Sequence, residues 1–246
     1  MKPYLLEIKY EFLSLLRSPR FAVPTLLLPP MFYIFFGMLL PMGKFSSAAA
    51  KNLLAGYCVF GVLATALWGI GANTAAERGL GWLDVKRASP MPPFAYIVSK
   101  LAGAILFGFI IQCTLMALAV FGVGLKLTIE QAGQLTLLMI AAAIPCGAIG
   151  FLVGAIASPQ SAPGLINLLA FPLAILSGLW LPMEMFPPAL RQIAPALPPY
   201  HVVEVALAIL GRRSGEDTGM HLLVLAGMTV VLLSAATAAW RRSERT

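Results

Sequence analysis

The amino-acid sequence predicts an all-α integral membrane protein with six transmembrane helices, an N-terminal amphipathic interfacial helix and a re-entrant or broken helical hairpin before the last transmembrane helix. Of the 246 residues, 59% are hydrophobic and only 11% are charged, whereas a soluble domain carries about 25% charged residues. The apolar residues gather in long runs, and about 20 such residues are needed to cross the hydrocarbon core of a membrane. Because the length suits one domain, residues 1–246 are interpreted as a single transmembrane domain.

Residues 1–20 have the pattern of a helix that lies along a membrane surface. The apolar positions recur at steps of three and four residues, which places them on one helix face, and polar residues occupy the other. A soluble amphipathic helix has the same pattern, but the apolar run that follows directly favours the surface location. The apolar face is Leu5, Ile8, Phe12 and Leu15, the polar face is Glu7, Glu11, Ser14 and Ser18, and the flanking cations are Lys2, Lys9, Arg17 and Arg20.

Six apolar runs are predicted to span the membrane. They cover residues 21–42, 53–76, 94–125, 128–157, 162–181 and 220–240. The third run is long enough to begin outside the hydrocarbon core, so we expect Lys100 to extend its ammonium group to the interface. Thr128 and Gln131 have the T-x-x-Q spacing of a capping box, which predicts the start of the fourth helix.

A charged segment, ERGLGWLDVKRASPMPPFAYIVSK, joins the second and third spans at residues 77–100. It is short and polar, and membrane helices hold both of its ends. A protein partner could therefore push on it, and we interpret it as a cytoplasmic coupling loop. The alternative is an ordinary solvated loop that only connects two helices, and charge content alone favours that alternative.

A second unusual segment, residues 182–219, precedes the last span. It contains an apolar run of about a dozen residues, which is too short to cross the membrane and fits a re-entrant or interfacial segment. We expect this hairpin on the external side. His201 and Glu204 lie one helical turn apart near the start of the run. They could form half of a metal site, but an anchored interfacial pair is favoured because a full set of ligands is not visible.

The distribution of basic residues predicts the topology. With six spans, both termini lie on one side, which then carries 11 of the 17 Lys and Arg residues, against 6 on the other side. The positive-inside rule places the N- and C-termini in the cytoplasm. The pattern suits a plasma membrane or bacterial inner membrane. Although the net charge is +7, there is no dense basic run with interleaved aromatics, so the cations point to lipid headgroups and not to nucleic acid.

Several kinds of chemistry find no support in the sequence. There is no G-x-x-x-x-G-K-[ST] for ATP phosphates, no H-E-x-x-H and no G-x-S-x-G. The three cysteines lie in apolar runs without C-x-x-C spacing, so neither a zinc site nor a redox motif is indicated. No acidic residue falls in the middle of a predicted span, which argues against self-powered ion coupling. If energy is used, we expect it to come from another chain, and we expect no metal or cofactor on this one.

Taken together, the order of these parts resembles the type-2 ABC export permeases. Three stretches carry the resemblance: the E-R-G loop at residues 77–100, the segment FPLAILSGLWLPMEMFPPALRQIAPALPPYHVVEVAL at 171–207, and RSPRF at 17–21. The first is similar to the family's E-R-G followed by a small-residue/Pro pair and a Lys at the third helix. The middle of the loop, Gly81-Trp82-Leu83-Asp84, departs from the family's usual T-L-E.

The resemblance implies a half-transporter. Two permease chains, expected as a homodimer, would pair around a substrate path, and two P-loop ATPase subunits carrying ATP and Mg would dock beneath them. The hairpin would cap the path from outside. Carried over from the family, the ATPase-coupling residues would be Glu77, Arg78, Gly79, Leu83, Ser89 and Pro90, and the path residues Asn73, Thr74, Asn167 and Ser177. For these last four, hydrogen bonding between helices is an equally good interpretation.

The resemblance implies an ATP-driven exporter of an amphiphilic substrate, such as a drug, lipid, peptide or glycan. Two other classes stay open at this point. An intramembrane enzyme should gather catalytic residues at one depth, and only His201 with Glu204 offers such a pair. A secondary transporter should place a carboxylate within a span. An exporter subunit should instead require a second polypeptide that carries a P-loop.

Overall fold

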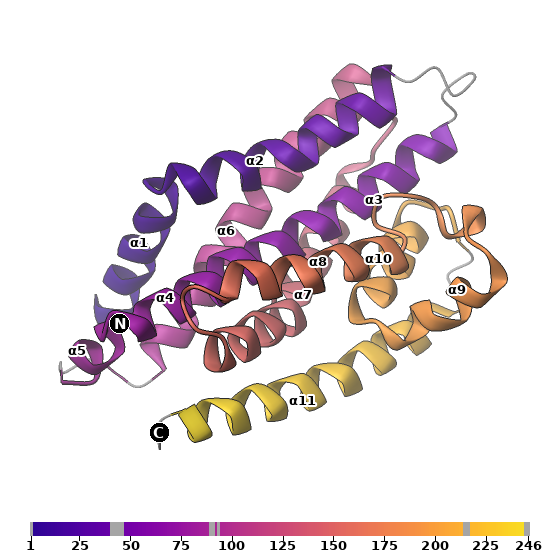
Figure 1. The fold of residues 1–246 in the computed structure, drawn as a ribbon. Coiled ribbons are helices and arrows are strands. Elements are labelled where there is room, and N and C mark those ends of the chain that lie inside the picture. Colours follow the sequence, from indigo (N-terminus) through magenta and orange to yellow (C-terminus); the bar gives the residue numbers. More distant parts are fainter. Residues whose placement is uncertain (1, 40–46, 89–91, 93, 214–216, 244–246) are drawn as a thin grey trace.

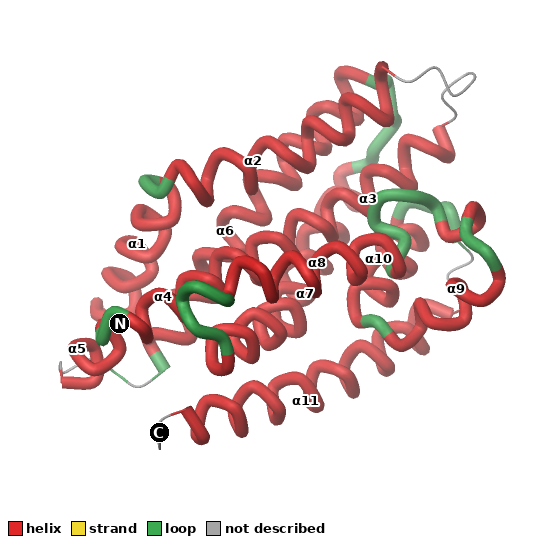
Figure 2. The backbone as a smooth tube through the Cα atoms, viewed as in Figure 1, coloured by secondary structure: helices red, strands yellow, loops and turns green. Residues whose placement is uncertain are grey.

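The structure is a computed structural model that describes residues 2–39, 47–88, 92, 94–213 and 217–243. Every regular element within these residues is helical, and no strand occurs among them (Figures 1 and 2). The start of α1 and the end of α11 lie at one end of the molecule, together with α4 and α5, and α9 and α10 lie toward the other end (Figure 1). The termini therefore share one side, as predicted.

The long helices run between these two ends. Five segments have the length and apolar composition to cross a membrane, and the first three of them join two or three elements: Pro19–Gly37, Ser47–Gly79, Ala95–Gly122, Ile129–Ile156 and Thr218–Arg242. The elements concerned are α2 (Pro19–Ile34), η1 (Phe35–Leu39), α3 (Ser47–Ala64), η2 (Thr65–Ala72), α4 (Asn73–Gly79), α6 (Ala95–Ala117), η3 (Leu118–Gly122), α7 (Ile129–Ile156) and α11 (Thr218–Ser243).

The shorter helices lie at the two ends or beside the long ones. They are α1 (Lys2–Leu16), α5 (Trp82–Ala88), α8 (Ala162–Leu176), η4 (Met183–Met185), α9 (Pro188–Ile193), η5 (Ala194–Ala196) and α10 (Pro198–Ile209). The prediction of six spans is thus confirmed for five long helices, whereas the predicted span 162–181 is a shorter apolar helix of 15 residues. At 1.5 Å per residue it covers roughly 22 Å, less than the hydrocarbon core of about 30 Å.

A glycine turn explains why α8 stops early. Gly178 has φ +73°, a backbone conformation that other residues rarely adopt. The N–H groups of Gly178 and Leu179 donate to the carbonyls of Ile175 and Ala174, which closes the last turn of the helix. Apolar composition continues through Leu181 in the sequence, so hydropathy alone overestimates the helix by five residues.

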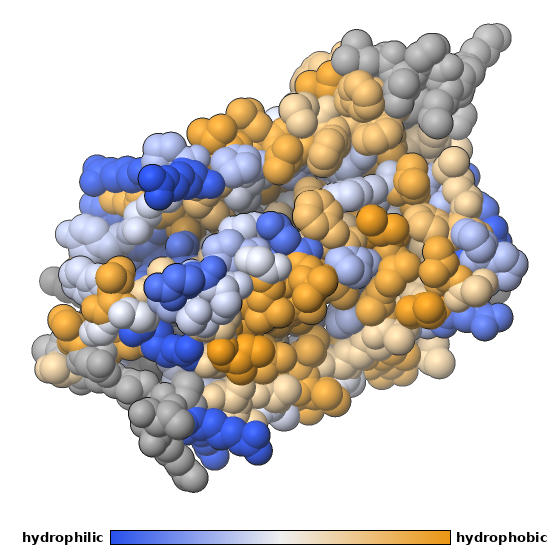
Figure 3. All heavy atoms as spheres, viewed as in Figure 1, coloured by the Kyte–Doolittle hydropathy of each residue, from blue (hydrophilic) through white to orange (hydrophobic). Residues whose placement is uncertain are grey.

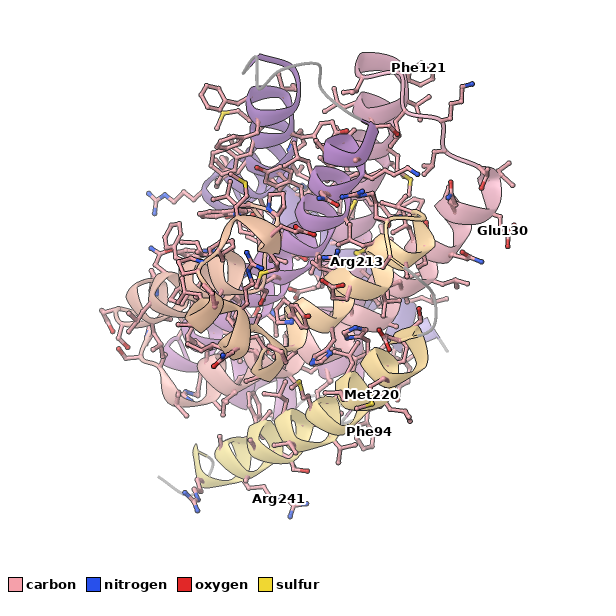
Figure 4. The ribbon with its side chains drawn as sticks, turned by 90° about the vertical axis from the view of Figure 1, so that its right-hand side faces the viewer. Phe94, Phe121, Glu130, Arg213, Met220 and Arg241 are labelled. Carbon is pink, nitrogen blue, oxygen red and sulfur yellow. The ribbon has the colours of Figure 1, made fainter. Side chains whose placement is uncertain are left out.

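The predicted capping box at the start of α7 is confirmed. Thr128 accepts a hydrogen bond from the Gln131 backbone N–H at 3.2 Å, and the Gln131 side chain accepts one from the Thr128 N–H at 3.1 Å. This capping box satisfies two N–H groups that the helix itself cannot pair. It lies at the end of the molecule opposite to the termini, where Figure 4 labels the neighbouring Glu130.

The core lies where α7 packs against η2. Small residues allow this close approach, since a side chain added at Gly150 would overlap the backbone carbonyl of Ala66, and one at Gly154 would overlap Thr74. Small-residue contacts of this kind are a main means of packing helices in lipid. By contrast, α11 leaves large apolar side chains such as Leu223 and Val231 exposed, and hydrophobic residues dominate the middle of the visible face (Figure 3). In a membrane protein, lipid solvates such surfaces.

Helix α1 packs differently from its predicted orientation. Leu15 is buried as expected, but Leu5 is exposed and Glu11 is buried. Glu11 and Leu15 are one helical turn apart, so they lie on the same side of α1, and both approach Gly103 of α6. The apolar periodicity identified the helix, but it placed Glu11 on the wrong face because the buried partner of this carboxylate comes from a distant part of the chain.

We predict that Gly150→Ala lowers the free energy of unfolding by about 1–3 kcal/mol, because the added methyl group overfills the contact between α7 and η2. Gly133→Ala is the matched control in the same helix, since nothing lies within 4 Å of the position its methyl would take. The unfolding midpoint in detergent should fall for the first variant and stay or rise slightly for the second. Equal midpoints for the two variants would contradict this packing.

Candidate functional site

A buried ammonium group lies where α1, α4 and α6 meet. The side chain of Lys100 is 1% exposed, and its Nζ lies 2.9 Å from Oε1 of Glu11 and 2.6 Å from Oε1 of Glu77. The prediction that Lys100 reaches the membrane interface is therefore wrong. Burying a charge without a partner is costly, and here two carboxylates replace the water that the ammonium would otherwise seek.

Tyr96 completes this group, which we call the Lys100 cluster (Glu11, Glu77, Tyr96 and Lys100). The Tyr96 hydroxyl donates to Oε2 of Glu77 at 2.9 Å, and it lies 3.1 Å from the hydroxyl of Thr74, from which it can accept. The Lys100 ammonium also lies 5.3 Å from the centre of the Tyr96 ring, within the range of a cation–π contact. Three segments that are far apart in the sequence are thus joined by charged and polar contacts.

The balance of charge in the cluster is unequal, because two carboxylates face one ammonium. Burial raises the pKa of the Glu11 carboxyl, and the Lys100 ammonium opposes that shift. A second ion pair lies beside the cluster, with Lys86 Nζ 2.6 Å from Oε1 of Glu7. This pair joins α5 to α1, so α1 is tied to α5 directly and to α4 through Lys100.

Arg78 and Gly79 tie the same loop to the turn between α7 and α8. The Arg78 guanidinium donates to the carbonyl of Ala155 and, at 2.9 Å, to that of Ala157. These carbonyls belong to the end of α7, where no further helical turn can pair them. A side chain at Gly79 would overlap the ring of Pro159. The contact between α4 and the end of α7 therefore requires both the guanidinium of Arg78 and a residue without a side chain at position 79.

The two faces of α5 and of the turn before it differ sharply. Leu83 is buried against residues of the bundle such as Tyr96 and Phe151. On the outside, Leu80, Trp82 and Val85 are 74%, 54% and 60% exposed. We call these three residues the exposed triad. The sequence did not identify these three as functional candidates, although a Trp within a charged segment is a signal of an interaction surface.

The predicted coupling residues thus have distinct places. Glu77, Arg78, Gly79 and Leu83 contact other helices and hold α4 and α5 to the bundle, and none of them belongs to the exposed triad. Ser89 and Pro90 lie outside the described residues.

An apolar groove of about 510 Å³ lies between α2, α3 with η2, and α8. Its volume is within the usual range for small-molecule sites, about 300–1,000 Å³. Asn73 and Asn167, from different helices, both line it. Thr74 and Ser177 do not contribute to this lining and are buried. The structure therefore brings two of the four predicted path residues to one groove.

A second cleft of about 470 Å³ adjoins the groove, and Asn73 lines both. Its lining mixes charged and apolar residues, including the carboxylates of the Lys100 cluster and Trp82 of the exposed triad. Asn73 therefore lies where the charged end of the molecule meets the apolar groove. Strongly hydrophilic residues gather at this end, near the termini (Figure 3).

The opposite end has its own charged contacts. Arg213, near the centre of Figure 4, lies 2.9 Å from the carboxylates of both Glu184 and Glu204, and so links the loop after α10 to η4 and to α10 itself. His201 contacts His221 of α11 at 2.9 Å and the carbonyl of Pro195 at 2.8 Å. The predicted pair of His201 with Glu204 is thus divided between two separate networks. No group of three potential metal ligands occurs in the described part of the chain.

Comparison with known proteins shows which family the chain belongs to. Residues 4–210 match the ABC-2 type transporter family, and the chain therefore belongs to that family. It is 25% identical over 238 residues to the putative transport permease YvfS of Bacillus subtilis, covering 95% of each chain. It is 32% identical to the inner membrane transport permease YhhJ of Escherichia coli over 151 residues, which are 60% of this chain and 40% of that protein. The YhhJ protein of Shigella flexneri matches equally.

This membership establishes the general role of the molecule. The chain is a multi-pass membrane protein and the non-catalytic transmembrane subunit of an ABC transporter, and such a permease works with a partner ATPase. The enzyme and secondary-transporter interpretations are thereby set aside. The missing P-loop noted in the sequence is consistent with this division of labour, because ATP phosphates require that motif on one of the chains.

We predict that Lys100→Met costs about 3–5 kcal/mol of stability, because it leaves the buried Glu11 and the half-buried Glu77 without their cation. Lys86→Met, whose ion pair is partly exposed, should cost no more than about 1 kcal/mol. Both are measured as unfolding midpoints in detergent. Adding Glu11→Leu to Lys100→Met should restore part of the lost stability, since it removes one of the two carboxylates that lack a cation. Equal effects of the two lysine variants would show that the cluster does not hold the helices together.

Proposed function

We propose that this chain is the permease half of an ATP-driven exporter in a bacterial inner membrane, with the N- and C-termini in the cytoplasm. Two copies pair around a substrate path, and an ATPase subunit docks beneath each copy. The substrate is an amphiphile of the kind represented by drugs, lipids, peptides and glycans. The topology is supported by the excess of Lys and Arg on the side of the termini, and the membrane by the printed name of the Escherichia coli relative.

The observation that carries the proposal is the exposed triad at the polar end of the bundle. Leu80, Trp82 and Val85 expose apolar side chains in a segment that also carries charged residues. Exposed apolar patches mark interaction sites when they are rimmed by polar residues, and a Trp at such a place is a frequent source of binding energy. The triad is therefore the docking surface for the ATPase.

The inward contacts of the same segment transmit the movement of the ATPase. Glu77 joins α4 to Lys100 of α6, Arg78 and Gly79 join it to the turn after α7, and Leu83 packs α5 into the core. A displacement of the triad therefore shifts α1, α6 and α7 together with it. ATP binding changes the permease only if the closed ATPase pair prefers one arrangement of these helices over the other in free energy.

The apolar groove forms the substrate path, with Asn73 and Asn167 as polar contacts on its walls. Thr74 and Ser177 are path candidates of a different kind, since both are buried and neither lines the groove, so they would face substrate only after the helices move. The hairpin of α9, η5 and α10, held by Arg213, caps the path on the external side.

We predict that Trp82→Glu removes the ATPase from the purified complex, because a carboxylate at the centre of an apolar contact is left desolvated. The measurement is the amount of P-loop ATPase that co-purifies with the permease in mild detergent, and we expect a loss of about tenfold or more. Ile129→Glu is the matched control, since Ile129 is 94% exposed at the opposite end of the molecule.

The unfolding midpoint should be unchanged in both variants, because each side chain is exposed. Retention of the ATPase by Trp82→Glu at the level of the control would remove the triad as docking surface. A permease that carries no ATPase even as the wild type, in a preparation that keeps other complexes intact, would contradict the proposed assembly.

A further inference from the structure

Among the described residues that line the apolar groove, Arg20 is the one charged side chain, and none of them carries a carboxylate. Arg20 lies in the first turn of α2, directly after the junction with α1. The rest of the groove is mainly apolar, with aromatic side chains such as Phe21, Trp68 and Trp180. The groove therefore offers a charged group and an apolar wall to the same ligand.

Arg20 is exposed and makes no ion pair or hydrogen bond with another described residue. By contrast, Arg78 bonds to carbonyls at the end of α7, and Arg213 bonds to two glutamates. Ser18, which also lines the groove, does not use its hydroxyl to cap α2. The polar groups at this end of the groove thus retain the capacity to bind a ligand.

The charges determine which amphiphile fits. A guanidinium binds carboxylate, sulfate and phosphate groups through paired hydrogen bonds, and its interaction with an anion is stronger where apolar walls exclude water. A cationic head would face Arg20 with no carboxylate among the lining residues to offset the repulsion. A neutral head would gain only the apolar contacts of the walls, which all amphiphiles share.

We propose that the groove selects an amphiphile with an anionic head, and that Arg20 is the residue that determines this specificity. The head binds at the start of α2, and the apolar tail lies along the aromatic wall toward Trp180. This inference rests on the proposed role of the groove as substrate path, and it narrows the substrate class from amphiphiles in general to those that carry a carboxylate, sulfate or phosphate.

The test is tryptophan quenching by brominated ligands in the purified chain, without ATPase. Trp68 and Trp180 line the groove, and Trp82→Phe with Trp240→Phe removes the other two indoles. The probes are 9,10-dibromostearate, its uncharged methyl ester, and a brominated alkyltrimethylammonium of similar length. We expect dibromostearate to bind about tenfold more tightly than the ester, and the cation to bind more weakly than the ester.

Arg20→Gln should abolish the difference between the acid and its ester, and Arg20→Lys should retain most of it. Arg17→Gln is the matched control: Arg17 is a nearby exposed arginine that does not line the groove, and this variant should keep the full preference. Equal binding of acid and ester to the wild type, or an equal loss in both glutamine variants, would overturn the proposal. Because the assay contains no ATPase, that failure is distinguishable from failure of the docking experiment with Trp82→Glu.

Discussion

The structure depends on the burial of one ammonium group between two carboxylates. Lys100 is the only fully buried cation among the described residues, and it contacts Glu11 of α1 and Glu77 of α4 at once. A buried ammonium needs such partners, because leaving a charge in the interior without one is costly in free energy. The cluster therefore fixes α1, α4 and α6 relative to one another, and the exposed triad gains a rigid support.

The molecule has a group of ion pairs at each end, and apolar helices lie between the two groups. At one end the Lys100 cluster holds α1 and α4 to α6, and at the other Arg213 holds the hairpin through Glu184 and Glu204. This distribution follows from the membrane, because ionisable groups are costly in the hydrocarbon region. The long helices connect the two groups of ion pairs, so a movement at the Lys100 cluster reaches Arg213 through them. Close contacts at residues such as Gly150 make these helices shift as packed units.

The sequence was a good guide where the signal was local. Hydropathy located the long helices, and the spacing of Thr128 and Gln131 located the start of α7. It failed where the deciding partner was distant: Lys100 was expected at the interface because Glu11, 89 positions away, is not visible as its partner in the sequence. Exposure is also a property of the folded chain, so the sequence indicated Glu77 and Arg78 by resemblance but could not distinguish their inward contacts from the exposed surface of Trp82.

The most direct test of this account asks whether α1 and α5 move as one body during the ATPase cycle. Glu7→Cys and Lys86→Cys, in a Cys113→Ser background, place one thiol on each side of the contact between these helices. A short bifunctional thiol reagent then bridges them, and ATP hydrolysis by the complex is measured before and after bridging. The account predicts an unchanged rate, because the bridge joins parts that already move together. Arrest of hydrolysis by the bridge, reversed on reduction, would show that the two helices separate in each cycle and would contradict the account.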